Sequence, residues 1–351
     1  MRSEKRGVAS GLGESGRGAV LSTDVPLEKG RGYHGAMERV EIIHEVVAAL
    51  GQAGFPLAGT CSGRLEEESS AYDAWVAAGL HGPLGYMAST AHLRRAPEAF
   101  LPWARGVFCV ALPYNTRREF SAAWTGRGRA WVSRYAWGRD YHKVVMAKLR
   151  PAVRLLRRLG YLAHAGVDTT PVMERALAAR AGLGFIGKNG LLIHPRYGSY
   201  LFLGEILTDL PLEDSPDRVA DGCGECALCM RGCPTRAFPR PGVLDASRCL
   251  STWTIEHRGA FPSEAPALSG HLFGCDRCQE VCPYNRRAPL AGEEAFRPRE
   301  GWFAPAPGRI AAMTEAEWDD STRGSALRRA RYDGLVRNAC RILEERERRA
   351  D

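Results

Sequence analysis

The stretch CGECALCMRGCPTRAF, residues 223–238, places four cysteines and a following proline within a few turns of chain. Their spacing, C-x2-C-x2-C-x3-C-P, is that of bacterial proteins that hold [4Fe–4S] clusters. Three thiolates on one tight loop reach one cluster, and the fourth, which starts a new turn, ligates a second cluster. Iron in a sulfide cage prefers such soft anionic ligands. The spacing therefore predicts an iron–sulfur module.

A second cysteine group lies downstream, in CDRCQEVCP. Its spacing, C-x2-C-x3-C, is one cysteine short, and Cys249 is the obvious substitute. Two clusters need eight thiolates, and the crossing of ligands between the motifs divides them into two sets. The first set is Cys223, Cys226, Cys229 and Cys282. The second set is Cys233, Cys249, Cys275 and Cys278.

Structural zinc is the alternative, because paired C-x2-C motifs also bind zinc. The run at 223–233 is a poor zinc spacing and a strong cluster spacing. Three cysteines, Cys61, Cys109 and Cys340, remain outside the two sets. Cys109 lies in an apolar run and is expected in the core.

The composition allows a sizeable core, in one large domain or two smaller ones. The chain has 351 residues, 45% of them hydrophobic, and a net charge of +8. A basic excess makes nucleic acid a candidate partner, beside the plain alternative of an ordinary basic protein. Eleven cysteines, with no export signal and no apolar run long enough to span a bilayer, favour a reducing compartment. We expect a cytoplasmic protein with no membrane partner.

The pattern of apolar residues predicts mixed helices and strands, and hence an α+β or α/β fold. Residues 1–36 are expected to be a disordered extension, with Met37 the better functional start. Helices are expected from 37 to 50, over 141–161 with a kink at Pro151, and after a cap at Thr170. Strands are expected at 106–112 and 161–167, with a hairpin over 191–208. The run GLGFIG (182–187) follows a helix, so it is not a dinucleotide fingerprint.

Several long motifs resemble epoxyqueuosine reductases and occur in that family's order. They are SRYAWGRDYHK (133–143), VDTTPVMERALAARAGLGFIGKN (167–189), GSYLFLGEILTDLPL (198–212), DASRCLSTWTIE (245–256) and GCDRCQEVCPYN (274–285), together with the first cysteine run. The resemblance covers most of residues 37–335.

The resemblance implies an enzyme that reduces the epoxide of epoxyqueuosine to queuosine at the wobble position of tRNA. Cob(I)alamin would act there, supplied with electrons through two [4Fe–4S] clusters. A nitroreductase-like cobalamin-binding catalytic domain would span 37–215, and a bacterial-ferredoxin-like domain with both clusters would span 216–290. Residues 291–351 would be a helical tail without the full helical-repeat domain of some members. An external donor such as a flavodoxin or ferredoxin would supply electrons to a monomer.

The resemblance also implies roles for single residues. Asp168, in the motif V-D-[ST]-x-P, would be the proton donor and would contact the cofactor, and burial beside a corrin would raise its pKa. Other expected cofactor contacts are Arg139, Tyr141, Lys188, Asn189, Ser251 and Asp276, and Asp140 and His142 belong to the same motif. The basic residues Arg94, Arg95, Arg134 and Arg139 would follow the tRNA backbone. The family's arginine after Met-Ala is replaced here by Ser89 and Thr90, so that contact is not carried over.

Two other functions fit part of the pattern. A reductive dehalogenase-like corrinoid reductase would act on a small organohalide, but such enzymes carry a twin-arginine export signal that is not seen here. A non-catalytic electron-transfer protein would need only the two clusters, and the long region before them argues against it. A test of corrin binding distinguishes the enzyme from an electron-transfer protein, which should bind none.

Overall fold

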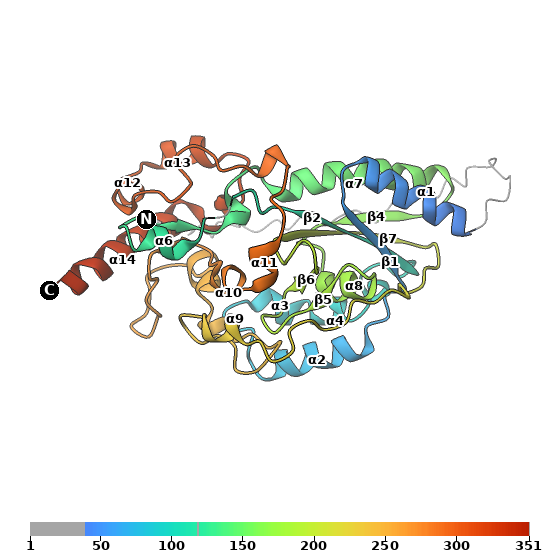
Figure 1. Ribbon diagram of the computed structural model, residues 1–351, viewed down its shortest axis with the longest axis horizontal. Coiled ribbons are helices and arrows are strands. Elements are labelled where there is room, and N and C mark those ends of the chain that lie inside the picture. Colours follow the sequence, from blue (N-terminus) through green and yellow to red (C-terminus); the bar gives the residue numbers. More distant parts are fainter. Residues whose placement is uncertain (1–38, 118, 351) are drawn as a thin grey trace, which may run out of the picture. The chain divides into compact units, whose positions relative to one another are not determined.

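A four-stranded antiparallel sheet forms the centre of the region before the cysteine motifs (Figure 1). The computed structural model describes residues 39–117 and 119–350. The strands run in the order β1 (Leu57–Cys61), β2 (Gly106–Pro113), β7 (Leu201–Thr208) and β4 (Ala163–Gly166). Because every pairing is antiparallel, the fold is α+β. The strands expected at 106–112 and 161–167 are confirmed as β2 and β4.

Strand β2 is buried along its whole length, which explains its continuous apolar sequence GVFCVAL. Successive side chains of a strand point to opposite faces. Phe108, Val110 and Leu112 enter one core, with α1 (Arg39–Gln52) and α7 (Tyr141–Arg158). Val107 and Cys109 enter the other core, with α8 (Glu174–Arg180). The sheet is therefore covered by helices on both faces.

Helix α7 is amphipathic, and its apolar side chains recur at helical spacing toward the sheet. Val145, Leu149 and Leu156 are fully buried. The side chain of Asp140 accepts a hydrogen bond from the His142 N–H and caps the helix start. The helix continues through Pro151 as one element, so Pro151 does not interrupt it.

Three other expectations are wrong in detail. Helix α1 continues through Gly51 to Gln52 and buries Ile42, whereas Val40 is exposed. Helix α8 begins at Glu174, after Met173 and without a side-chain cap, so Thr170 does not cap it. Of the expected hairpin only the turn forms, closed by one antiparallel bridge between His194 and Gly198. Beyond it, β6 (Leu192–Ile193) pairs with β5 (Phe185–Ile186), whereas β7 pairs with β2 and β4.

The residues after 291 fold back onto the rest of the chain and do not form a free tail. The helix α14 (Arg331–Ala350) packs with β8 (His271–Phe273), which pairs in parallel with β3 (Trp131–Val132). Around this pair a separate core contains four tryptophans, Trp131, Trp137, Trp302 and Trp318. All described residues fall within one compact unit, so the domain boundaries at 215 and 290 stay predictions.

The remaining elements are short and surround these cores. The α-helices are α2 (Glu66–Ala77), α3 (Gly85–Ser89), α4 (Ala91–Arg94), α5 (Pro97–Phe100), α6 (Ser121–Thr125), α9 (Leu228–Arg231), α10 (Arg277–Glu280), α11 (Pro283–Arg287), α12 (Pro307–Ala311) and α13 (Glu315–Thr322). The 3-10 or π turns are η1 (Arg134–Ala136), η2 (Ala246–Arg248), η3 (Thr252–Glu256), η4 (Glu294–Phe296) and η5 (Ala326–Ala330).

Within the described part of the chain, no helix has the length and apolar character needed to cross a bilayer. The extension expected at residues 1–36, with the start at Met37, lies outside the described residues.

Candidate active site and iron–sulfur centre

Four thiols line one cavity of about 260 Å³ between the α9 and α11 segments. They are Cys223, Cys226, Cys229 and Cys282. Burial raises the pKa of Cys282, and the neighbouring thiols of Cys223 and Cys226 raise it further. The four thiols therefore line a shared cavity and act on one another electrostatically. These are the four members of the first set expected from the spacing.

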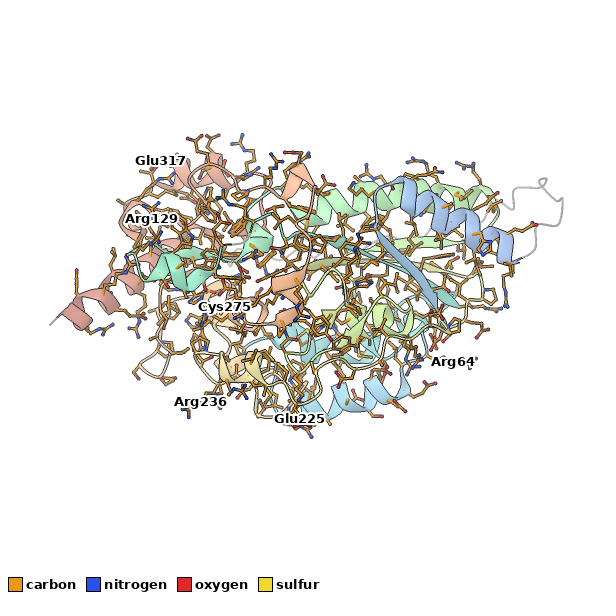
Figure 2. All side chains as sticks on the ribbon, viewed as in Figure 1. Arg64, Arg129, Glu225, Arg236, Cys275 and Glu317 are labelled. Atoms are coloured by element: carbon orange, nitrogen blue, oxygen red, sulfur yellow. The ribbon has the colours of Figure 1, made fainter. Side chains whose placement is uncertain are left out.

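The other four thiols interact with one another around α10, which contains Cys278. Burial raises the pKa of Cys275 and Cys278 well above the usual value, and the thiols of Cys249 and Cys233 raise both further. Figure 2 labels Cys275, which lies just before α10. Cys278 also interacts with Cys229 of the first set. The two sets are therefore neighbours, as electron transfer between two clusters requires.

Backbone N–H groups donate to the cysteine sulfurs in both sets. Lys188 N–H donates to Cys223 Sγ at 3.5 Å, and Ala237 N–H donates to Cys233 Sγ at 3.3 Å. The Ser251 hydroxyl donates to the Cys249 thiol. Such donors stabilise thiolates and tune cluster potentials. Lys188 and Ser251, expected at the corrin, thus contact cluster cysteines in this structure.

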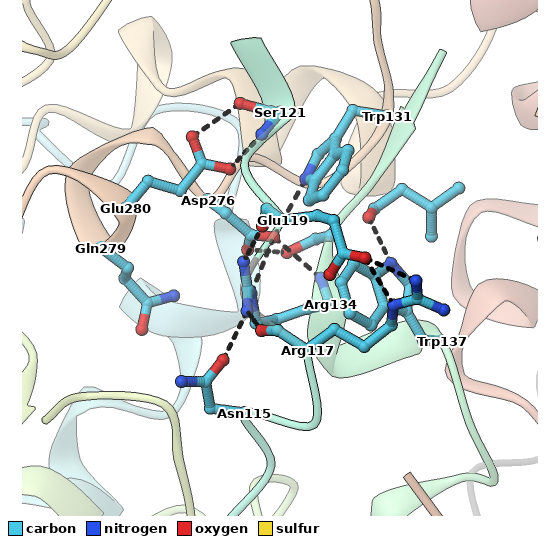
Figure 3. A network of polar contacts seen from close by, with 12 residues as sticks. Asn115, Arg117, Glu119, Ser121, Trp131, Arg134, Trp137, Asp276, Gln279 and Glu280 are labelled. Atoms are coloured by element: carbon cyan, nitrogen blue, oxygen red, sulfur yellow. Dashed lines mark hydrogen bonds and ion pairs between the residues drawn. The ribbon is translucent and has the colours of Figure 1, made fainter. Parts of the chain in front are cut away.

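The buried pair Arg134 and Asp276 connects the two halves of the chain (Figure 3). Both side chains are 1% exposed. The Asp276 carboxylate accepts hydrogen bonds from Trp131 Nε1 at 3.0 Å and from the Arg134 N–H at 2.8 Å, and also from Ser133 Oγ. The carboxylate is therefore occupied within the protein and does not face a cofactor, in contrast to the expected corrin contact.

Arg134 is likewise a structural residue and does not follow a tRNA backbone. Its guanidinium donates to Asn115 Oδ1 and to the carbonyl oxygens of Arg117 and Glu119, and it lies 4.3 Å from the centre of the Tyr200 ring. The expected RNA contact is wrong because the side chain is enclosed.

The other three expected tRNA-binding arginines differ in their surroundings. Arg94 donates to the Val172 carbonyl at 3.2 Å and so braces the segment after Asp168. Arg95 forms an exposed ion pair with Asp73 at 3.1 Å. Arg139 is exposed. Arg139 is thus the best placed of the four to reach an external ligand.

Asp168 follows β4 and has a positive φ of 60°, which is uncommon for a residue other than glycine. Its side chain is 57% exposed, and Oδ2 lies 3.3 Å from His142 Nε2. The other ring nitrogen, His142 Nδ1, lies 2.8 Å from Asp140 Oδ1. The Tyr141 hydroxyl also donates to Asp168. The structure thus gathers the motif residues 140–142 around Asp168.

His142 carries a proton in this arrangement. Burial lowers its pKa, but hydrogen bonds and charge from Asp140 and Asp168 outweigh burial and raise it to about 9. At neutral pH the ring is therefore an imidazolium between two carboxylates.

The protein groups around Asp168 lower its pKa, whereas a rise from burial beside a corrin stays a prediction. Burial acts to raise the pKa, but the hydrogen bond and charge of His142, the hydroxyl of Tyr141 and the charge of Arg329 lower it overall. Asp168 is therefore ionised at neutral pH, and His142 holds the proton that the pair can release.

Aromatic rings pack against the imidazole ring of His142 and one another. The Tyr141 ring stacks on His142, with ring centroids 4.1 Å apart, and on Phe202, with centroids 4.4 Å apart. Tyr135 meets Tyr141 edge to face at 6.0 Å. These contacts fix the imidazole plane, and they follow from the alternation that points Phe202 of β7 toward α7.

Arg329 and Tyr86 belong to the same site, and the sequence analysis missed both. Arg329, in η5, forms a paired hydrogen bond with the Glu256 carboxylate, and its charge acts on Asp168. Its guanidinium lies 5.9 Å from the centre of the Tyr86 ring, which is 45% exposed. Only tertiary folding brings residues 86, 168, 256 and 329 together, so no local signal could have revealed them.

Gly166 allows the Asp168 loop to approach β7. A Cβ atom there would lie 2.2 Å from Thr170 Oγ1 and 2.5 Å from Glu205 Oε1. Gly166→Ala is therefore expected to cost about 1–3 kcal/mol and lower Tm by several degrees. Gly51→Ala is the matched control, because a Cβ at Gly51 meets nothing within 4 Å. Equal Tm values for both variants in thermal unfolding would contradict the packing described here.

Two family profiles match the chain. One is described as "4Fe-4S double cluster binding domain" and matches residues 222–285. The other is described as "Epoxyqueuosine reductase QueG, DUF1730" and matches residues 94–169. The first profile supports iron–sulfur clusters over structural zinc for the eight thiols.

Relatives and solved structures agree with these profiles. The epoxyqueuosine reductase of Pseudomonas aeruginosa is 40% identical over 293 residues, which cover 82% of this chain and 81% of the relative. A solved epoxyqueuosine reductase with an epoxyqueuosine-modified tRNA-Tyr stem loop is 29% identical, with a TM-score of 0.77, covering 87% of this chain and 82% of that one. The Bacillus subtilis enzyme, solved with its catalytic aspartate loop swung out of the active site, is 28% identical, with a TM-score of 0.75 and the same coverage.

The site geometry, the profile matches and the extent of these similarities lead to one conclusion. This chain belongs to the epoxyqueuosine reductase family.

Proposed function

We propose that this protein reduces the epoxide of epoxyqueuosine in the tRNA anticodon to the alkene of queuosine. The overall reaction takes up two electrons and two protons and releases the epoxide oxygen as water. The observation that carries the proposal is the pair of His142 and Asp168, which is open to solvent and holds a proton at neutral pH. Family membership supplies the substrate class, and the two thiol sets supply a path for electrons.

The donor atoms fit the two inorganic clusters. The eight proposed ligands are thiols in two sets of four, and the first set surrounds a cavity. We propose Cys223, Cys226, Cys229 and Cys282 for one [4Fe–4S] cluster and Cys233, Cys249, Cys275 and Cys278 for the other. An external donor such as a flavodoxin or ferredoxin would reduce them, and we propose that the enzyme acts in the cytoplasm as a monomer.

The residues near the first set also fit cobalamin. Asn189 is 5% exposed, and its Nδ2 has no hydrogen-bond partner among the described residues. Ile186, three positions earlier, is 41% exposed. An unpaired amide donor beside an exposed apolar side chain suits a large ring that carries carboxamide groups. We propose Asn189, Tyr141, Arg139 and Asp168 as the residues that line this ligand. Cobalamin, when bound, supplies the strong reductant that breaks the carbon–oxygen bond.

The protein's own part is proton delivery and placement. Asp168 Oδ2 receives a proton from His142 Nε2 and passes it to the departing epoxide oxygen, so the pair acts as a general acid. Asp140 holds the imidazole through Nδ1 and keeps Nε2 toward Asp168. Arg139 is exposed, and Arg329 is partly exposed beside Glu256, so both would attract RNA phosphates.

The pH dependence of the reaction follows from His142. Because its pKa is raised to about 9, the proton is present below that pH and is lost as pH rises through it. We expect the single-turnover rate to fall above about pH 9. In His142→Asn the remaining acid is Asp168, whose pKa is lower. The fall in rate at high pH, the basic limb, should therefore begin at a lower pH.

The measurement is the rate of queuosine formation between pH 6 and 10, with His44→Asn as a control on the exposed face of α1. An unchanged basic limb in His142→Asn would exclude His142 as the proton source.

Cobalamin binding tests the proposed function independently of turnover. The holoenzyme with reconstituted clusters is mixed with cob(II)alamin under anaerobic conditions, and the EPR and UV–visible spectra are recorded. A shifted cobalt signal is expected, and Asn189→Leu should weaken binding. Two clusters with no change in the cobalt signal would contradict the enzyme and favour an electron carrier. Turnover of an organohalide in place of the tRNA stem loop would favour a dehalogenase.

A further inference from the structure

A pair of carboxyl groups, Glu205 buried and Glu174 half-buried, lies next to the Asp168 loop. Glu205, on β7, is 1% exposed and lies opposite Gly166 in the register with β4. Glu174 is the first residue of α8, and its carboxyl group hydrogen-bonds to that of Glu205. Glu205 Oε1 has no hydrogen-bond partner among the described residues. Two carboxyl groups in such contact share a proton, because both cannot ionise at this distance.

The surroundings decide which group keeps that proton. Burial raises the pKa of Glu205 well above its usual value, and the charges of Glu174 and Asp168 add to this. Burial and the charge of Asp168 raise the pKa of Glu174. Hydrogen bonds from the Asp168 N–H and from Glu205, and the charge of Arg175, lower it. The resulting pKa is about 7. Glu205 is therefore the neutral donor and Glu174 the acceptor.

The packed elements supply few other charges. The Cys109 thiol on β2 lies opposite Glu205, and its own pKa is raised, chiefly by a hydrogen bond with Cys61 and by burial, so it is neutral. Thr170 Oγ1 lies beside the same site and carries no charge. Arg175 is thus the cation that acts on Glu174.

Glu174 connects this pair to Asp168. Its Oε1 accepts a hydrogen bond from the Asp168 backbone N–H. At the same residue the backbone has the positive φ of 60°. Aspartate adopts this conformation more readily than most residues other than glycine, and the hydrogen bond from its N–H to Glu174 adds to what holds it there. A carboxylate acceptor holds an N–H more strongly than a neutral carboxylic acid does.

We propose that Glu174 and Glu205 are positioning residues for Asp168. Glu205 keeps the shared proton and donates it in a hydrogen bond to Glu174. The Glu174 carboxylate then holds the Asp168 N–H, and this orientation presents the Asp168 carboxylate to His142. The catalytic meaning of this arrangement rests on the proposed function, whereas the arrangement itself can be tested without turnover.

The Glu174–Glu205 pair should make the reaction rate fall at low pH, and this fall is the acidic limb of the pH dependence. Above about pH 7, Glu174 is ionised and holds the loop. As pH falls through that value, Glu174 gains a proton and the hydrogen bond to Asp168 weakens. The rate should therefore fall below about pH 7 for a reason that is separate from the basic limb of His142.

Glu174→Gln, Glu174→Leu and Glu205→Gln test the proposal against the control Glu213→Gln, an exposed acid beyond β7. Glutamine keeps an acceptor for the Asp168 N–H but does not titrate. Glu174→Gln should stay within about threefold of the wild-type rate at pH 8 and lose the acidic limb. Glu174→Leu should lower kcat by about tenfold or more, with KM for the stem loop little changed. Glu205→Gln should move the acidic limb to lower pH, because Glu174 then has a permanent donor.

Hydrogen–deuterium exchange supplies the readout that does not depend on activity. Overlapping peptides across residues 163–173 report the Asp168 amide in the holoenzyme. The amide should be protected in the wild type and in Glu174→Gln, and should exchange about tenfold faster in Glu174→Leu. If no variant turns over epoxyqueuosine but exchange follows this pattern, the proposed function fails and the positioning role stands.

Two results would overturn the positioning role. One is unchanged exchange and unchanged kcat in a folded Glu174→Leu. The other is a fall in rate at low pH that persists in Glu174→Gln.

Discussion

Asp168→Asn is expected to slow reduction of epoxyqueuosine by roughly 10²- to 10⁴-fold, the range that general acids contribute. The amide cannot receive the proton of His142 and pass it on. Asparagine adopts a positive φ readily, so the backbone at φ 60° is preserved. Asp168→Ala would be less informative, because alanine adds strain at that conformation.

Two measurements separate loss of the acid from loss of structure. The first is the single-turnover rate of queuosine formation, with Asp73→Asn, an exposed partner of Arg95, as a control. The second is the pKa of His142 by NMR, which should fall because Asp168 is one of the two groups that raise it. A rate within threefold of wild type, together with a lowered His142 pKa, would remove Asp168 from the proton path.

Cys278→Ser is expected to abolish turnover. Cys278 interacts with the other three thiols of its set and also with Cys229 of the first set, so it lies where the two sets meet. The variant should retain one cluster, and the iron content should fall from about eight to about four per chain. Electrons would then have no complete path through the two sets.

Cys282→Ser should remove the cluster held by the first set of thiols and leave the cluster held by the second set. Cys340→Ser is the control, because this exposed thiol belongs to neither set. Iron analysis and EPR of the reduced proteins distinguish the two losses. Retention of both clusters in either variant would refute the division of ligands proposed here, and zinc in place of iron would refute the clusters themselves.

Much of the fold and of the cluster region could be predicted because the signals are local. The run GVFCVAL predicts a strand buried on both faces, and β2 is one. The crossing of ligands between cysteine motifs is a property of spacing alone; Cys223, Cys226, Cys229 and Cys282 line one cavity, and the division of the eight thiols between two clusters stays a prediction. Only the turn of the expected hairpin forms, at the His194–Gly198 bridge, since β7 has β2 and β4 as its neighbours.

The polar core and the electrostatics could not be predicted, because they depend on residues far apart in the chain. Charged residues such as Asp276 and Arg134 are expected at the surface when only the sequence is known. In the structure both side chains are buried, and they contact each other within one polar network. The pKa of Asp168 was expected to rise through burial beside a corrin, with no account of neighbouring charges. The nearby imidazolium of His142, 26 residues earlier, reverses the direction.

The most direct test of the central claim is a single-turnover reaction on an anticodon stem loop that carries epoxyqueuosine. The holoenzyme, with both clusters and cobalamin, is reduced anaerobically, and the nucleosides are analysed by mass spectrometry. The account predicts that epoxyqueuosine loses one oxygen atom and becomes queuosine, and that Asp168→Asn suppresses this change. An unchanged epoxide after incubation with the fully loaded, reduced enzyme would contradict it.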